Sequence, residues 1–375
     1  MEEKPTLPDQ LTDREKEILD RLAAGLTDQQ IAAELFLSHN TVRWYNRQIY
    51  SKLGVSSRTQ AIHRGRSLGI LKPETRAISP HPETDPPPAP NNPLKQQRVR
   101  FTQSFDGARI AYALSGTGPP LVKVATFMSH LEYDWDSLLW RHLLEELNRD
   151  HTLIRYDERG NGLSDWDVED VSFETWVRDL EAVVDAAGLD RFPLFANSQG
   201  GTVAITYAVR HPERVSHLIL YGAYARGWLN RDLTDEQRAE EKLIIDLMRV
   251  GWGRENPAFR QVFAMQLRPD STIDDLRAFD EQMQISTSAE NAARLESEMH
   301  RTDVSSIAPL VNVPTLVIHA RGDAGVPFEE GRLLASLIPD AQFVALESNN
   351  HLLTEHEPAW AKFVAAFRSF LNRDS

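Results

Sequence analysis

The chain has 375 residues, 41 basic and 55 acidic side chains, a formal net charge of −14 and no cysteine. The lack of cysteine excludes disulfides, thiolate catalysis and cysteine-bound zinc or iron–sulfur clusters. The acidic charge argues against a chain that binds nucleic acid over its whole surface. No run of 18 apolar residues and no amino-terminal signal pattern occurs, so we expect a cytoplasmic protein without a membrane segment.

The amino-terminal 71 residues predict a small all-α domain with helices over 12–24, 28–35, 39–53 and 57–69. Three helix starts fit the capping box, in which a hydroxyl and a Glu or Gln side chain each accept a backbone N–H: Thr12–Glu15, Thr27–Gln30 and Ser57–Gln60. Ser38 is expected as a plain N-cap, and Gly25 and Gly54 as helix ends.

The short turn between the second and third helices has helix-turn-helix spacing. The stretch from Leu35 to Leu71 carries six basic residues and no acidic one, which predicts a local basic face on an acidic protein. A solvated helix surface is the plainer explanation of that charge. The outward-facing residues of the third helix are expected to be His39, Asn40, Arg43, Trp44 and Arg47. In a helix-turn-helix domain this helix lies in the major groove of DNA, so these side chains would face the DNA.

This region closely resembles the LuxR-type DNA-binding domain, through Leu11–Glu17, Ala24–Thr27, Thr41–Arg43 and Lys52–Val55. The resemblance implies that the third helix reads double-stranded DNA, with Thr41, Arg43 and Lys52 contacting phosphates or bases. It also implies dimerisation through the fourth helix, so we expect a homodimer on a promoter or operator. Trp44-Tyr45 departs from the family pattern, which leaves the base preference open. A helical bundle that does not bind DNA is the alternative.

Residues 72–98 are polar and interrupted by eight prolines, which predicts an extended, semi-rigid linker. The expected organisation is therefore a helix-turn-helix domain over 1–71, a linker over 72–98 and a second domain over 99–375.

From residue 99 onward, strands and helices alternate, which indicates an α/β fold with a mostly parallel sheet. Asp106-Gly107 predicts a hairpin between strands over 100–105 and 109–114. Further strands are expected near 121–125, 152–156, 192–196, 216–221, 315–319 and 342–346, with helices over 172–187, 199–210 and 357–371. Residues 223–308 contain only helical patterns and predict a helical cap insertion over the strand ends, where α/β sheets bind ligands.

Three residues follow strands in the order that a Ser-Asp-His triad requires. Ser198 stands in a strand–turn–helix pattern typical of a nucleophile elbow. Asp323 and His351 each come directly after a later strand. A serine needs a base to become a nucleophile, and the base needs an acid to orient it.

Residues 98–375 also resemble the α/β-hydrolase superfamily, through this order and through the segment Arg155-Tyr-Asp-x-Arg159-Gly160-x-Gly162-x-Ser164-Asp165. The resemblance makes Ser198 the nucleophile, His351 the base and Asp323 the orienting acid. Two positions depart from the family. Ala196 stands where the family usually has a glycine, two residues before the serine. The family's oxyanion strand usually ends in His-Gly, and this chain has Val124-Ala125-Thr126-Phe127 there instead. The oxyanion hole would use the backbone N–H groups of Phe127 and Gln199.

Aromatic residues around this region, including Phe127, Trp135 and Trp228, are expected to line a largely apolar pocket suited to a small hydrophobic ester or lactone. No metal-ligand cluster or phosphate loop occurs, so we expect no cofactor. The sequence therefore predicts a transcriptional regulator whose hydrolase domain senses a ligand. In one form of this hypothesis the domain also hydrolyses that ligand. Two alternatives stay open: a catalytically inactive receptor with a hydrolase fold, and a metabolic serine hydrolase with an accessory helix-turn-helix domain.

Overall fold

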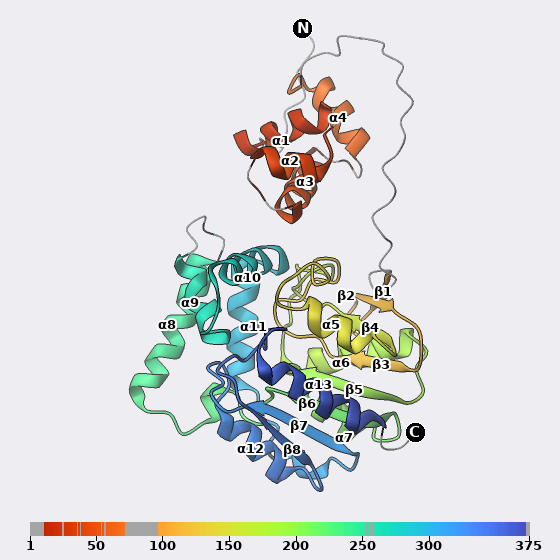
Figure 1. Ribbon diagram of the computed structural model, residues 1–375, viewed down its shortest axis with the longest axis vertical. Helices are drawn as coiled ribbons and strands as arrows, with labels where there is room; N and C mark the ends of the chain where they lie inside the picture. The colour runs from red at the N-terminus through yellow and green to blue at the C-terminus, as the bar shows by residue number, and fades with distance from the viewer. Residues whose placement is uncertain are drawn as a thin grey trace. The chain divides into compact units, whose positions relative to one another are not determined.

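The computed structural model of the protein describes residues 11–24, 26–35, 37, 39–53, 55, 58–71, 97–252, 254 and 258–372 (Figure 1). Contacts divide the chain into two compact units, Met1–Pro90 and Asn91–Ser375. Most of the predicted linker, 72–96, lies outside the described residues, so the linker and the proposed domain limits stay predictions.

The amino-terminal unit contains the four predicted helices, α1 (Asp13–Ala23), α2 (Asp28–Leu35), α3 (His39–Leu53) and α4 (Arg58–Ser67). The capping box at Thr12 and Glu15 is present, and Thr27 and Gln30 bond each other in the same way. The predicted caps and helix ends at Gly25, Ser38, Gly54 and Ser57 lie outside the described residues. The core of this unit is formed by apolar side chains that recur at helical spacing: Ile18, Leu19, Leu22, Ile31, Val42, Ile49 and Leu53.

The second unit is built on one eight-stranded sheet with the order β1-β2-β4-β3-β5-β6-β7-β8. Its strands are β1 (Gln97–Gln103), β2 (Arg109–Ser115), β3 (Pro120–Lys123), β4 (Thr152–Tyr156), β5 (Phe192–Asn197), β6 (Val215–Tyr221), β7 (Thr315–Ala320) and β8 (Gln342–Leu346). The strands β1 and β2 form the predicted antiparallel hairpin, and β2 also pairs antiparallel with β4. All other pairings are parallel, which confirms the mostly parallel α/β sheet.

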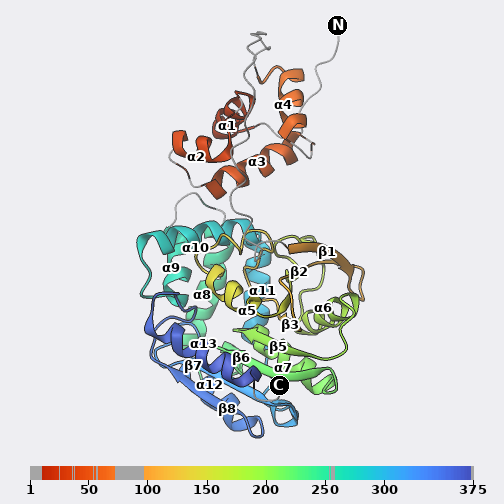
Figure 2. The same cartoon turned by 45° about the vertical axis from the view of Figure 1, so that its right-hand side comes forward.

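Helices cover both faces of the sheet, because its central strands are apolar on both sides. The helices α6 (Phe173–Ala186), α7 (Gly200–Arg210) and α12 (Phe328–Leu337) pack on one face. The helices α5 (Arg141–Asn148) and α13 (Pro358–Leu371) pack on the other face (Figure 2). The helices α5 and α12 were not among the predicted elements. Neither has a side-chain cap hydrogen bond at its start, but α6, α7 and α13 also lack one; α5 and α12 are short, with 8 and 10 residues.

The predicted cap is confirmed as helical. It contains η2 (Trp228–Asn230), α8 (Asp235–Gly251), α9 (Ala258–Leu267), α10 (Ile273–Ser286), α11 (Ala289–Arg301) and η3 (Ala308–Leu310). Capping boxes at Thr234 and Thr272 begin α8 and α10. The helices α8 to α11 lie together beside the sheet (Figures 1 and 2).

Gly201 fixes how closely α7 approaches the end of β6. A Cβ atom at this position would lie 2.4 Å from the Cβ of Ala223, far inside normal contact distance. Alanine in place of glycine inside a helix ordinarily stabilises a protein by about 0.5–1 kcal/mol. Here we expect the opposite sign for Gly201→Ala, a loss of about 1–3 kcal/mol of unfolding free energy from overpacking. Urea denaturation measures it, and a gain in stability would show that α7 is not held this tightly.

Candidate active site

The turn between β5 and α7 places Ser198 in a backbone conformation that few non-glycine residues adopt. Its φ is +52°, in the left-handed region, where a side chain costs roughly 1–3 kcal/mol. Hydrogen bonds hold the turn, from the Ser198 N–H to the Tyr221 carbonyl at 3.0 Å and from the Gly201 N–H to the Ser198 carbonyl at 3.0 Å. Ala196 is fully buried in β5, so its methyl group is accommodated where the family usually has glycine. The predicted elbow is therefore present.

Asp323 and His351 meet although 28 positions separate them, because β7 and β8 are neighbouring parallel strands. Each residue lies in the loop that follows its strand. The His351 Nδ1 atom is 2.8 Å from Asp323 Oδ2. The other carboxylate oxygen, Oδ1, accepts the backbone N–H groups of Gly325 at 2.9 Å and Val326 at 2.7 Å. The carboxylate is thus fixed by its own loop and faces the imidazole.

The backbone of His351 is fixed by two further contacts. Its N–H donates to the Leu267 carbonyl at 2.8 Å, and its own carbonyl accepts the Tyr221 hydroxyl at 2.6 Å. Gly222, with a φ of +57°, leaves space for the ring, since a Cβ there would lie 2.9 Å from His351 Cε1. The His351 Nε2 atom has no hydrogen-bond partner among the described residues. This nitrogen is therefore available to a group in the cavity that His351 and Ser198 both line.

The electrostatics keep Asp323 ionised. Burial acts to raise the pKa of this carboxyl, but the charge and hydrogen bond of His351, together with nearby His319, lower it below its ordinary value. Burial lowers the pKa of His319, whose Nε2 lies 2.9 Å from the Val326 carbonyl and 3.5 Å from Asp323 Oδ2. Sequence reasoning did not find His319 or Tyr221, because each lies within a buried strand where such residues serve packing as often as function.

The two predicted oxyanion residues contact each other. The backbone N–H of Phe127 donates to the side-chain Oε1 of Gln199 at 3.3 Å, and the Thr126 hydroxyl donates to the same oxygen at 2.8 Å. The Gln199 Nε2 donates in turn to the buried Glu158 at 3.3 Å. Burial raises the pKa of Glu158 to about 8. One of the two predicted donors is therefore occupied by the protein's own side chain.

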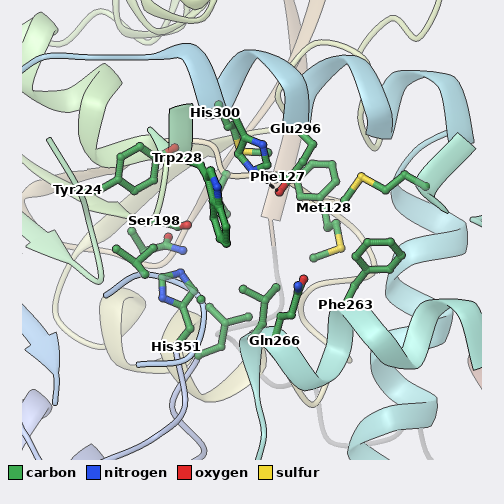
Figure 3. Close-up of a pocket in the computed structure, with 18 of the residues that line it drawn as sticks. Phe127, Met128, Ser198, Tyr224, Trp228, Phe263, Gln266, Glu296, His300 and His351 are labelled. Carbon is green, nitrogen blue, oxygen red and sulfur yellow. Dashed lines mark ion pairs between the residues drawn. The ribbon is translucent and has the colours of Figure 1, made fainter. Parts of the chain in front are cut away.

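A cavity of about 120 Å³ opens between this turn and the cap (Figure 3). Most of its wall is apolar or aromatic, and it includes Phe127, Met128, Trp140, Trp228, Met248, Trp252, Phe263, Met299 and Leu352. The expectation that Trp135 lines the pocket is wrong. Its indole N–H donates to Gln97 at 2.9 Å and its ring packs against the Arg155 guanidinium, so it is buried away from the cavity.

The far end of the cavity carries charged side chains. The His300 ring lies 3.1 Å from Glu296, which lines the cavity with it (Figure 3), and 3.3 Å from Glu241. Burial acts to lower the pKa of His300, but its hydrogen bonds to both carboxylates outweigh burial and raise it. The lining of the cavity also includes the guanidinium of Arg231, so charges of both signs lie in its wall. A second hollow of about 270 Å³ shares Trp228, Glu296 and His300 with the cavity.

The residues expected to contact DNA all belong to α3, although the side chains of Asn40 and Arg43 lie outside the described residues. Thr41, Trp44 and Arg47 are partly exposed. Lys52 has an internal partner, because its ammonium lies 2.8 Å from the buried carboxylate of Glu15. A DNA contact by these side chains stays a prediction, and for Lys52 the contact would compete with that ion pair.

Within the described part of the chain, no group of three or more His, Asp or Glu residues is arranged to hold a metal ion. None of the described helices combines the length and the apolar character needed to span a membrane.

Comparison with known proteins identifies both units. Residues 9–64 match the family described as bacterial regulatory proteins, luxR family, and residues 128–358 match the alpha/beta hydrolase fold. A pyrrolizixenacetamide deacetylase of Xenorhabdus hominickii is 27% identical over 70% of this chain and 95% of its own length. A 2-hydroxymuconate semialdehyde hydrolase of Pseudomonas putida is 28% identical over 51% of this chain and 67% of its own length.

Solved structures show the same fold. A thermophilic esterase from Thermogutta terrifontis is 27% identical, with a TM-score of 0.58 over 74% of this chain and 98% of the esterase. An esterase from Exiguobacterium antarcticum, 23% identical, has a TM-score of 0.62 over 73% of this chain and 99% of its own.

Proposed function

The chain belongs to the alpha/beta hydrolase fold family, and from this membership we propose that its second unit binds and cleaves a small hydrophobic ester or lactone. Its luxR-family unit binds double-stranded promoter DNA, and the ligand state of the hydrolase unit controls that binding. The observation that carries the proposal is the fixed His351–Asp323 pair beside Ser198. The Nε2 atom of His351 has no hydrogen-bond partner among the described residues, and His351 and Ser198 both line the apolar cavity.

The proposed reaction is acyl transfer through Ser198. His351 Nε2 takes the hydroxyl proton while Ser198 Oγ attacks the ester carbonyl, and Asp323 stabilises the imidazolium that forms. The tetrahedral intermediate collapses, the alcohol leaves with the proton from His351, and the acyl group stays on Ser198. Water activated by His351 then attacks the acyl-enzyme, which releases the acid and restores the serine.

The lining supports a neutral, hydrophobic ligand. Apolar surface favours transfer of apolar groups from water, and most of the residues that line the cavity are apolar or aromatic. Among the relatives are a deacetylase and an esterase, and these names describe the removal of acyl groups.

The regulatory part of the proposal rests on the presence of both units in one chain. We expect DNA binding by the luxR-family unit to respond to the ligand bound in the hydrolase unit, and hydrolysis of that ligand would end the response. We expect the DNA-bound form to be a homodimer, since two copies of one reading helix match a two-fold operator.

One observation favours a second candidate, a catalytically inactive receptor. The Phe127 N–H, a predicted oxyanion donor, already donates to Gln199. A missing donor lowers kcat by about 100- to 1000-fold. The same cavity would then bind the ligand without rapid turnover.

Hydrolysis of short p-nitrophenyl esters tests the enzyme. Ser198→Ala removes the nucleophile, so kcat/KM is expected to fall at least about 1000-fold. Ser336→Ala, on the surface of α12, serves as the matched control and should retain the wild-type rate. Equal rates for wild type and Ser198→Ala would remove the catalytic claim and leave the receptor.

Gln199→Met tests whether the Gln199 side chain restrains turnover. Methionine keeps the length and packing but removes the oxygen that accepts the Phe127 N–H. We expect kcat for p-nitrophenyl acetate to rise by about 10-fold or more, within the range that one oxyanion donor supplies. Thr126→Val, which removes a hydroxyl that holds Gln199, should act in the same direction. A lower kcat in a folded Gln199→Met protein would contradict this account.

Mobility shift with genomic fragments tests the DNA-binding claim, with and without a panel of small esters. Arg47→Met should weaken binding and reduce the salt dependence by about one counterion, because it removes one positive charge from α3. Arg98→Met makes the same charge change in β1 and should leave affinity unaltered. Absence of sequence-selective binding under every condition would refute the regulatory proposal.

A further inference from the structure

A buried glutamine of the cap binds the segment that carries a predicted oxyanion donor. Gln282 of α10 is fully buried. Its Nε2 donates to the Met128 carbonyl at 2.8 Å, to Asp134 Oδ1 at 3.0 Å and to Ser286 Oγ at 3.1 Å. Burial of an amide costs free energy unless the amide is hydrogen-bonded, so an apolar side chain would be the ordinary occupant of such a position. The contacts with the Met128 segment account for a polar side chain here.

Met128 needs these contacts because its backbone is strained. Its φ is +62°, in the left-handed region, which costs a non-glycine residue roughly 1–3 kcal/mol. The Met128 carbonyl also accepts the Ser286 hydroxyl at 3.1 Å. Gln282 and Ser286 are four positions apart on α10 and therefore lie on one face of the helix. Among the described residues, both hydrogen bonds to this carbonyl come from the cap.

Met128 directly follows the residue whose backbone N–H is a predicted oxyanion donor, and both residues line the cavity beside Ser198 (Figure 3). Rotation about φ of Met128 turns the peptide plane that it shares with Phe127, so relaxation of Met128 would displace Phe127. The Phe127 ring contacts the cap as well, with its centroid 5.6 Å from that of Trp252. The indole N–H of Trp252 donates to the Met283 carbonyl on α10 at 3.0 Å. The cap thus holds both residues of this segment.

We propose that Gln282 is a positioning residue for ester cleavage, which holds the Met128 carbonyl from the cap and thereby orients the Phe127 N–H. Gln282 does not line the cavity, so it acts through Met128 and not by touching the ligand. Gln199 competes for this N–H, whereas Gln282 sets its direction. The inference rests on the proposed function, because an oxyanion donor matters only if Ser198 attacks a carbonyl.

The variant Gln282→Met tests the proposal, because methionine keeps the length of the side chain and removes both amide hydrogens. We expect kcat for p-nitrophenyl acetate to fall by about 10- to 100-fold, with KM changed by less than about 3-fold, as for a catalytic group displaced by about 1 Å. Gln284→Met makes the same change on the exposed side of α10, where Gln284 donates to Asp280 at 3.2 Å, and should keep the wild-type kcat. A folded Gln282→Met protein with the wild-type kcat would overturn the proposal.

Ser286→Ala removes the second hydrogen bond to the Met128 carbonyl. One hydrogen bond contributes about 0.5–1.5 kcal/mol, so kcat should fall by a smaller factor, about 3- to 10-fold. This variant decides the question if Gln282→Met does not fold, and an unchanged kcat in Ser286→Ala would then count against the proposal.

Hydrogen exchange of the full chain, read by mass spectrometry, tests the positioning without any substrate. In Gln282→Met the amides of residues 127–131 should exchange faster than in wild type, while those of 349–353, which include His351, keep their rate. Equal exchange at 127–131 in the two proteins, or faster exchange along the whole chain, would contradict a positioning role. If wild type cleaves no ester, the proposed function fails, and exchange at 127–131 still decides whether Gln282 holds this segment.

Discussion

The left-handed backbone at Ser198 is the constraint on which the rest of the site depends. A non-glycine residue with a φ of +52° persists only where its surroundings hold it. Here β5 ends, α7 begins after two residues, and Gly201 lets α7 approach Ala223 closely. The serine is thereby raised at the edge of the sheet where the loops after β7 and β8 deliver Asp323 and His351.

Much of this arrangement could be predicted because it depends on local patterns. Apolar runs marked the later strands, Asp106-Gly107 marked the hairpin of β1 and β2, and capping residues such as Thr12 and Thr27 marked helix starts. The order of Ser198, Asp323 and His351 along the chain then placed all three at one sheet edge, since parallel strands end on the same side. The helices α5 and α12 were missed because they are short, with 8 and 10 residues, so few apolar positions carry their helical pattern.

Contacts between distant segments could not be predicted in this way. Thr126 and Gln199 both stood out as residues near the oxyanion hole, but their shared hydrogen bond arises only when β3 and β5 pair. Trp135 was expected in the pocket because it is aromatic and nearby, whereas its N–H is satisfied by Gln97 in β1. Lys52 matched a DNA-contacting position, yet its ion pair with Glu15 depends on how α1 packs on α3.

The hydrogen bond from Phe127 to Gln199 is the feature that distinguishes the two candidate functions, because it occupies a predicted oxyanion donor that an enzyme needs and a receptor does not. The central claim is therefore that Ser198 is reactive. The most direct measurement is labelling of the full chain with a fluorophosphonate, followed by peptide mass spectrometry. A serine activated by His351 attacks the phosphorus and displaces fluoride, and this step needs no particular ester as substrate. The account predicts one stoichiometric adduct on Ser198, lost in His351→Ala. An unlabelled Ser198, or labelling that persists equally in His351→Ala, would contradict it.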